Sequence, residues 1–261
     1  MRFHERIELP GEDGKARPIG EKELVDVLTR TQAINDGDDI TQFEITTAAA
    51  FLAFAEHKAR LVIQSPEESP EITALGAVLA ETACDIKFYN APVGSTDDAV
   101  RLAQNAAQAF GGLDTVINII CFSSADLAGA RSVTEVENLV ADKLLPATLI
   151  TRVAANRMRL TLTEGSILNV VLCPVPANGA EAALIGVIRA ALAAMTRGEA
   201  KEWAGEAIRI NAIGPRSEAT VGAVLSSEPD IAYLGLQLAS KKGRQLTGHV
   251  FDAEGVASQH C

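Results

Sequence analysis

Apolar and polar positions along the chain switch repeatedly between two periods, which indicates a regular succession of strands and helices. Short apolar runs predict strands at 60–64, 85–89, 115–120, 166–171, 208–213 and 249–252. A helical period predicts helices at about 46–58, 70–84, 96–110, 134–160, 178–197 and 229–240. Strands and helices that alternate with short connections are typical of a parallel sheet covered on both faces. We therefore expect an α/β fold with a doubly wound parallel sheet.

The first forty residues differ from the rest of the chain. The segments 10–14 and 35–39 are rich in glycine, aspartate and asparagine, which is the chemistry of turns, and residues 21–29 between them resemble a short amphipathic helix. A sheet of this kind would have its first strand here. We expect residues 1–40 to form either a degenerate first strand or an extension that packs on a partner, and residues 41–261 to form the α/β domain.

Composition and charge narrow the classes of partner. The 261 residues are 48% hydrophobic but only 4% aromatic, so alanine, leucine, isoleucine and valine must form the core of one domain. A net charge of -11 and a pI near 4.9 argue against nucleic acid or an anionic membrane as the main partner. No apolar run reaches the ~18 residues of a membrane span, and the polar start lacks the hydrophobic segment of a signal peptide. We expect a cytoplasmic protein.

The four cysteines have no arrangement that predicts a metal site. They contain no Cys-x-x-Cys pair and no zinc-ligand spacing, so we interpret them as buried thiols. One alternative stays open. Cys121 and Cys173 would lie at the carboxyl ends of two neighbouring strands, where doubly wound sheets bind ligands.

Several framework segments are similar to those of a known family. Phe110-Gly-Gly-Leu-Asp-Thr-Val-Ile-Asn118 resembles the entry into the fourth strand of short-chain dehydrogenases/reductases. Residues 165–169 resemble the fifth strand of that family, residues 208–215 the sixth, and residues 238–240 with 246–250 the last helix and strand. The resemblance covers roughly residues 44–255 and implies a Rossmann-like sheet of the short-chain dehydrogenase type.

The residues that would carry the family's chemistry are replaced. In that mechanism a tyrosine transfers the hydroxyl proton, a lysine lowers its pKa, a serine positions the carbonyl, and an asparagine supports a water relay. The aligned positions here are, in the same order, Ala177, Glu181, Leu172 and Lys143. Neither tyrosine of the chain is followed four residues later by lysine. We therefore assign no catalytic residue, and interpret the remaining general-base candidates, Glu181 and Lys143, as solvated helix residues.

The pattern for cofactor binding is missing as well. Dinucleotide binding needs glycines between the first strand and the first helix, where the backbone approaches the pyrophosphate. The aligned residues 41–47 contain no glycine and place the anionic Glu44 near the phosphates. The family's Asn-Asn-Ala-Gly reads Asn118-Ile-Ile-Cys121, and only about twenty residues after Pro215 remain for a substrate lid. We expect neither a cofactor nor a metal ion.

A chain that keeps the family's framework segments but lacks its catalytic residues is expected to be a catalytically inactive subunit. In the family, the long helix after the fourth strand and the helix after the fifth pack against a second subunit, and helix 180–195 is rich in small residues. We expect a homo-oligomer, or a hetero-oligomer in which the chain supports or regulates an active paralogous short-chain dehydrogenase. The alternatives are a divergent NAD(P)-dependent oxidoreductase with relocated catalytic residues, and a small-molecule-sensing Rossmann module whose ligand binds near Cys121 and Cys173.

Overall fold

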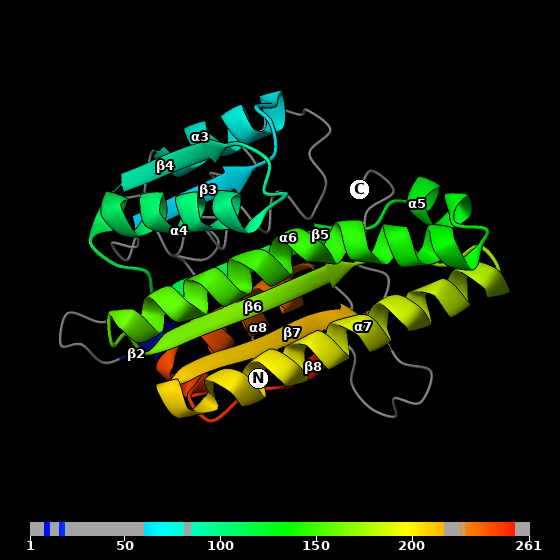
Figure 1. Ribbon diagram of the computed structural model, residues 1–261. Coiled ribbons are helices and arrows are strands. Elements are labelled where there is room, and N and C mark those ends of the chain that lie inside the picture. The colour runs from blue at the N-terminus through cyan, green and yellow to red at the C-terminus, as the bar shows by residue number, and fades with distance from the viewer. Residues whose placement is uncertain are drawn as a thin grey trace. The chain divides into compact units, whose positions relative to one another are not determined.

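A computed structural model describes residues 8–10, 16–18, 60–80, 85–216, 225 and 228–253 (Figure 1). The chain divides into two compact units, one of Met1–Pro92 with Glu228–Gln237 and one of Val93–Ser227 with Leu238–Cys261. The expected helices at 21–29 and 46–58 and the glycine-free stretch 41–47 lie outside the described residues. The expected domain boundary at residue 40 is therefore still a prediction.

The first unit contains two small ladders. β1 (Glu8–Pro10) and β2 (Ala16–Pro18) pair antiparallel, on either side of the segment for which a turn is predicted. β3 (Arg60–Ser65) and β4 (Asp85–Asn90) pair in parallel, and α3 (Pro70–Ala80) lies between them in sequence. The expected β-α-β order of residues 60–90 is confirmed.

The second unit is built on a four-stranded parallel sheet in the order β5-β6-β7-β8. Its strands are β5 (Thr115–Cys121), β6 (Gly165–Leu172), β7 (Ile208–Pro215) and β8 (Val250–Ala253). Its helices are α4 (Thr96–Phe110), α5 (Ser124–Gly129), α6 (Val133–Leu160), α7 (Gly179–Trp203), the 3-10 turns η2 (Ala204–Glu206) and η3 (Lys241–Gly243), and the end of α8 (Glu228–Ala239). This is the expected α/β Rossmann-like architecture.

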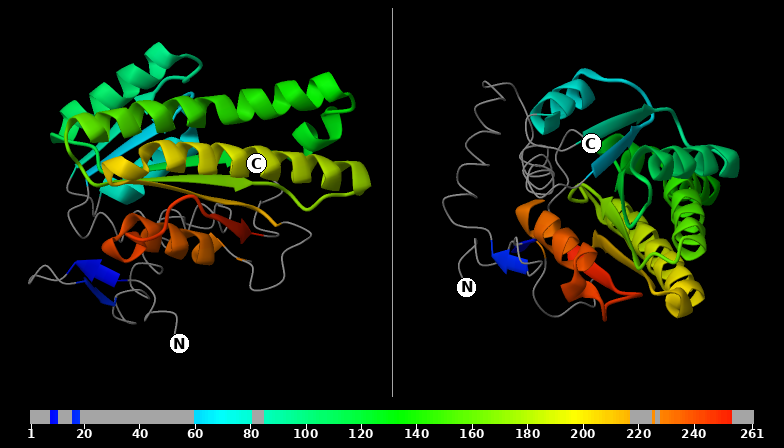
Figure 2. Two further views of the ribbon diagram at one scale, coloured as in Figure 1. Left: turned by 60° about the horizontal axis from the view of Figure 1, so that its bottom comes forward. Right: turned by 90° about the vertical axis from the view of Figure 1, so that its left-hand side faces the viewer.

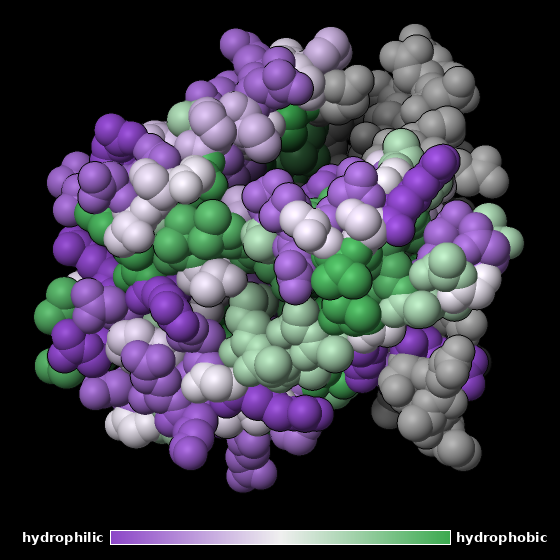
Figure 3. Space-filling model, turned by 45° about the vertical axis from the view of Figure 1, so that its right-hand side comes forward, coloured by the Kyte–Doolittle hydropathy of each residue, from purple (hydrophilic) through white to green (hydrophobic). Residues whose placement is uncertain are grey.

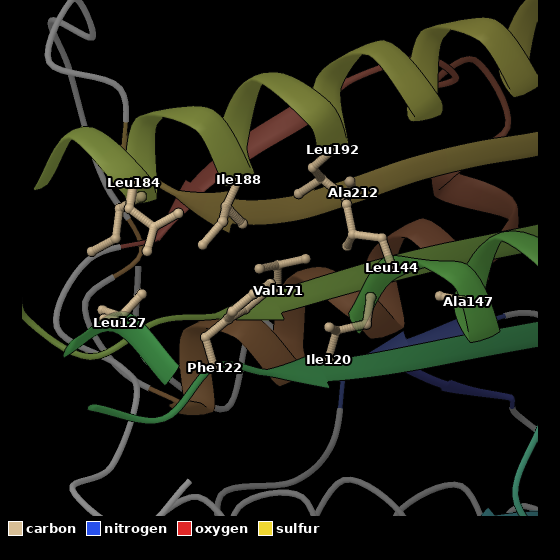
Figure 4. Packing of buried hydrophobic residues seen from close by; sticks show 11 residues of the cluster. Ile120, Phe122, Leu127, Leu144, Ala147, Val171, Leu184, Ile188, Leu192 and Ala212 are labelled. Carbon is tan, nitrogen blue, oxygen red and sulfur yellow. The ribbon is translucent and has the colours of Figure 1, made fainter. Parts of the chain in front are cut away.

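One face of this sheet is covered by α6 and α7, which run side by side along β6 and β7 (Figures 1 and 2). All eight residues of β6 are buried, as expected for a central parallel strand. In Figure 4, Leu184, Ile188 and Leu192 point from α7 toward the sheet, where Val171 and Ala212 meet them. A second cluster around Met158 and Ile167 continues this core toward the amino ends of the strands. The sheet and the two helices are thus held by continuous apolar packing.

The helix α7 is unusually apolar. By length and composition, the continuous helical stretch Gly179–Glu206 is apolar enough to cross a membrane, and it is the one such helix among the described residues. Only 28% of its apolar window is buried within the chain. The expectation that no uninterrupted apolar run reaches about 18 residues still holds, because Glu181 and Arg189 interrupt this stretch. The same helix packs Ile188 and Leu192 into the core, which is the behaviour of a core helix in a soluble protein.

Candidate functional site

The carboxyl ends of β5 and β6 form the edge at which the family's chemistry would take place. Cys121 pairs in register with Leu172, and the N–H of Phe122 donates to the carbonyl of Leu172 at 2.9 Å. The expected serine position therefore holds a leucine that is only 2% exposed. Its side chain is buried and apolar, so it offers a substrate carbonyl no hydrogen bond.

Cys121 and Cys173 both lie at this edge but do not share a face of the sheet. Side chains alternate along a strand, so Cys121 lies on the face of its register partner Leu172. Cys173 instead packs against the core cluster that contains Ile188 of α7. The two thiols therefore lie on opposite faces of the sheet, and a ligand site near them stays a prediction.

Lys143, at the expected relay-asparagine position, holds α5 against the end of β5. Its Nζ donates to the carbonyl of Cys121 at 3.1 Å and forms an ion pair with Oδ2 of Asp126 at 2.8 Å. The ammonium also lies 5.8 Å from the centre of the Phe122 ring. The interpretation of Lys143 as a solvated helix residue is thus only part of the description: 36% of its side chain is exposed, and its charge is also bonded inside the chain.

Asp126, the ion-pair partner of Lys143, also belongs to the capping box at the start of α5. Its carboxylate accepts from the N–H of Ser123 at 2.8 Å, and its own N–H donates to the Ser123 hydroxyl at 3.1 Å, which fixes the start of α5. Burial by itself raises the pKa of Asp126, but the hydrogen bonds from Lys143 and Ser123 outweigh it and hold the pKa below its ordinary value. The Asp126 carboxyl is therefore ionised at neutral pH.

Glu181, at the expected lysine position, caps α7. Its carboxylate accepts from the N–H of Ala177 at 2.7 Å and from Nδ2 of Asn178 at 2.9 Å. Asn178 is the N-cap residue, and its Oδ1 accepts from the N–H groups of Ala180 and Glu181 at 3.0 Å each. The carboxylate thus folds back over the helix start and is not simply solvated. Ala177, at the tyrosine position, contributes only its backbone to this cap.

A buried polar network, which the sequence did not single out, joins the sheet to α6. Nδ2 of Asn118 donates to Oδ1 of Asn169 at 2.8 Å and lies 3.3 Å from the hydroxyl of Thr151. Asn118 and Asn169 are register partners on β5 and β6, and all three residues are buried. The sequence held one signal for this network: Asn118 and Asn169 occupy matching positions on two strands that were predicted to be neighbours. The network positions α6, and it lies below the edge at which a substrate would bind.

A second network that the sequence did not reveal ties α6 to α7. Glu199 of α7 is 3% exposed, and its Oε1 accepts from Nε of Arg152 at 2.6 Å. Its other oxygen accepts from the indole N–H of Trp203 at 3.1 Å. The hydrogen bond to Glu199 raises the pKa of Arg152. A buried carboxylate is tolerated here because both of its oxygens are bonded.

The connection from β7 to α8 is short. Pro215 and Glu228 bound it, and within it Leu225 pairs with Ala253 beside the end of β8. The N–H of Leu225 donates to the carbonyl of Asp252 at 2.9 Å. Residues 217–224 lie outside the described part of the chain, so the shortened substrate lid is still a prediction.

The described side chains do not fit the family's nicotinamide cofactor. The carboxylate of Glu181 stands where the lysine would hold the ribose, and it is turned back onto the helix start. The ammonium of Lys143 is bonded to Asp126. In the described residues, moreover, no group of three or more histidine, cysteine or carboxylate side chains could hold a metal ion.

Comparisons with known proteins identify the family. The sequence matches the family model described as enoyl-(acyl carrier protein) reductase over residues 44–223, and no curated protein matches it. The structure is similar to the citronellol catabolism dehydrogenase AtuB of Pseudomonas aeruginosa PAO1, with 19% identity over 80% of this chain and 89% of that one and a TM-score of 0.61.

Two further solved structures have the same fold. A short-chain dehydrogenase of Mycobacterium avium is 24% identical over 80% of this chain and 79% of that one, with a TM-score of 0.61. YwfH, an NADPH-dependent reductase involved in bacilysin biosynthesis, is 20% identical over 80% of this chain and 94% of that one, with a TM-score of 0.63. With the family model covering more than half of the sequence, the chain belongs to the short-chain dehydrogenase/reductase family.

Proposed function

We propose that this chain is a catalytically inactive short-chain dehydrogenase/reductase subunit that supports or regulates an active paralogous dehydrogenase through oligomer formation. The observation that carries the proposal is the use of Glu181 as a helix cap. In an active member, this position supplies a cation to the catalytic acid. Here it supplies an anion that is bonded to the backbone of Ala177, the residue at the tyrosine position.

The other replaced positions support the same proposal. Ala177 has no proton to transfer, and Leu172 has no hydroxyl with which to orient a carbonyl. Lys143 has a titratable amine, but its ammonium is engaged by Asp126 and by the carbonyl of Cys121. A proton relay through this group would have to break an ion pair that holds α5 in place.

Assembly is supported by the apolar surface that α7 leaves uncovered. Only 28% of the apolar window of this helix is buried within the chain, and Val187 on α7 is 48% exposed. Figure 3 shows hydrophobic and weakly hydrophobic side chains in a band between polar margins on the side of the molecule that it displays. Exposed apolar side chains that lie together in this way favour a contact with another protein. We place the assembly in the cytoplasm.

A cofactor titration tests whether the chain has lost cofactor binding and catalytic activity. Titration of NADH and NADPH into the purified chain, followed by nucleotide fluorescence, should give no saturable binding. A variant that restores both residues of the pair, Ala177→Tyr with Glu181→Lys, should also lack reductase activity on carbonyl and enoyl-thioester substrates, because the positions around the pair are changed too. Micromolar binding by the unaltered chain, or turnover by it, would overturn the proposal.

Isolation from the native source tests the supporting role. Native mass measurement of the tagged chain should detect a complex that contains a second short-chain dehydrogenase. The activity of that enzyme should fall, or its thermal inactivation should quicken, when the chain is removed. A stable complex that lacks any dehydrogenase, with unchanged enzyme activity after removal, would contradict the supporting role.

A second candidate is a divergent NAD(P)-dependent reductase. The description of the matching family model and the NADPH-dependent reductase YwfH among the similar structures favour it. Lys143 would then be the cation near the bound substrate, after release from Asp126. Micromolar NADPH binding that is weakened by Lys143→Met, with the fold unchanged by circular dichroism, would favour this candidate over the inactive subunit.

A further inference from the structure

The one asparagine–glycine pair of the sequence stands at the start of α7. Asn178 is the N-cap residue, and Gly179 is the first residue of the helix. Both residues are exposed, so water reaches the peptide bond that joins them. Glycine has no side chain that would hinder attack by its own nitrogen on the preceding side-chain amide. Residue type and exposure therefore both favour spontaneous deamidation of the asparagine.

Deamidation at this pair would proceed through a five-membered ring. The nitrogen of Gly179 loses its proton and forms a bond to Cγ of Asn178, while the Nδ2 group takes up a proton and leaves as ammonia. Water then adds to one of the two ring carbonyls and opens the succinimide. The product is aspartate at position 178 or its isoaspartyl isomer, and one water is consumed for each ammonia released.

The helix cap holds the Asn178 amide away from this reaction. Its Oδ1 accepts from the N–H groups of Ala180 and Glu181 at 3.0 Å each, and its Nδ2 donates to Oε1 of Glu181 at 2.9 Å. Ring closure requires Cβ of Asn178 and the nitrogen of Gly179 to be eclipsed about the Cα–C bond, but a ψ of 173° keeps them staggered. The amide carbon can reach that nitrogen only after a rotation that breaks the cap.

Glu181 is the residue that closes the cap. Its Oε2 accepts from the N–H of Ala177 at 2.7 Å, while its Oε1 holds Nδ2 of Asn178. One carboxylate thus fixes both the asparagine amide and the residue before it. The carboxylate also lies at the positive end of the helix, where an anion is stabilised. Its removal would free the amide to rotate while the rest of α7 stays packed on the sheet.

We propose that Asn178 is a deamidation site and that the carboxylate of Glu181 controls its reaction. With the cap closed, the pair reacts slowly. With the cap open, it reacts at the rate of an unstructured asparagine–glycine segment. The inference does not depend on the proposed function, because succinimide formation needs no cofactor, substrate or second subunit.

The reaction would change the start of α7 permanently. Aspartate at position 178 keeps the oxygen that accepts from Ala180 but loses the Nδ2 donor, so its carboxylate and that of Glu181 repel each other. The isoaspartyl product also inserts one methylene into the backbone immediately before the helix. Both products weaken the cap that now joins Ala177 to the first turn of α7.

Ageing of the purified chain at mildly alkaline pH tests the proposal. Peptide mass measurement follows the small mass gain that accompanies the change of the amide to a carboxylate. The native chain should react about tenfold or more slowly than the same chain unfolded in urea, because the cap must open first. Glu181→Ala should raise the native rate about threefold or more, since it removes two hydrogen bonds to a charged group. Glu181→Gln should lie between the two.

Two matched variants serve as controls. Glu202→Ala removes an exposed carboxylate near the other end of α7 and should leave the rate unchanged. Gly179→Ala should block the reaction, because a methyl group hinders the attacking nitrogen. The substitution fits the folded chain, since a Cβ at position 179 would have no described neighbour within 4 Å. Circular dichroism checks that each variant keeps its helices.

Each part of the proposal has an outcome that overturns it. An unfolded chain that stays unmodified, or a modification that persists in Gly179→Ala, would exclude Asn178 as the site. A native chain that reacts as fast as the unfolded one would show that the cap gives no protection. A folded Glu181→Ala chain that reacts no faster than the unaltered chain would exclude the control by Glu181.

Discussion

At the carboxyl ends of β5 and β6, charged side chains are bonded within the chain, whereas on the outward face of α6 and α7 they are exposed. Lys143 and Glu181 stand at positions that carry chemistry in the family, and here one holds α5 and the other caps α7. Arg152 is also fixed by an internal partner, but most of its side chain is exposed. The contrast teaches that Lys143 and Glu181 at this edge stabilise the start of α5 and of α7, while the charged side chain of Arg152 is fixed by the chain and still largely exposed to solvent.

The largest effect should come from the core beneath the reaction edge. Phe122 is fully buried beside Leu127 and Leu184, so Phe122→Ala should reduce the free energy of unfolding by about 3–5 kcal/mol in urea denaturation. The matched change on the outward face is Leu145→Ala, at a residue that is 45% exposed. It should reduce the stability of the monomer by less than about 0.5 kcal/mol. Equal losses of unfolding free energy at Phe122 and Leu145 would contradict the contrast between the buried core and the exposed helix face.

The junction between α6 and α7 should show the next largest effect. Glu199→Ala removes the acceptor shared by Arg152 and the Trp203 indole, and should lower the free energy of unfolding by about 2 kcal/mol. Glu202→Ala, at an exposed carboxylate of the same helix, is the control and should be nearly neutral. A neutral Glu199→Ala would mean that the buried carboxylate does not fix Arg152.

Restoration of the family's lysine should destabilise the chain. Glu181→Lys removes two hydrogen bonds from the start of α7 and places a cation at the positive end of the helix, for a loss of about 1–2 kcal/mol. Glu181→Gln keeps an acceptor oxygen and should lose less than half as much in the same thermal denaturation series. A lysine variant as stable as the unaltered chain would contradict the role of Glu181 as a cap.

The ion pair of Lys143 with Asp126 should have the smallest effect, and one that depends on pH. Asp126→Asn should lower stability at pH 7 by about 0.5–1 kcal/mol, because the pair is partly exposed. The folded-state pKa of Asp126 is lowered, so the stability that it contributes is present above an unfolded-state value of about 3.9 and is lost as the pH falls through the folded-state pKa. The difference between the two proteins should therefore close at acid pH. A difference that persists well below the folded-state pKa of Asp126 would exclude the ion pair as its cause.

Periodicity was sufficient to place the regular elements. The six predicted strands and the predicted helices from residue 70 onward are present, with α7 continuing past the predicted end at 197 to Trp203. The helix α5 was not predicted, because its six residues are too few for a helical period to be recognised. The Ser123-x-x-Asp126 pattern of its capping box was the signal that could have found it.

The sequence likewise predicted only part of the candidate site. The sequence predicted that Leu172, Ala177, Glu181 and Lys143 stand at the family's catalytic positions, from the framework segments on either side, and this assignment stays a prediction. It did not identify Asp126 as the partner of Lys143 or Glu199 as the partner of Arg152. Those pairs join residues 17 and 47 positions apart, across elements whose relative placement depends on core packing.

Two kinds of information about this protein therefore have different origins. The order of strands and helices and the family were determined by the sequence, because hydrophobic period and residue identity are local properties. The loss of the tyrosine and lysine pair was predicted from the sequence and stays a prediction. The present roles of Glu181, Lys143 and Arg152 were decided by the tertiary structure. A hydrogen bond requires its atoms to lie within about 3 Å, and only the packed helices and sheet bring these groups that close.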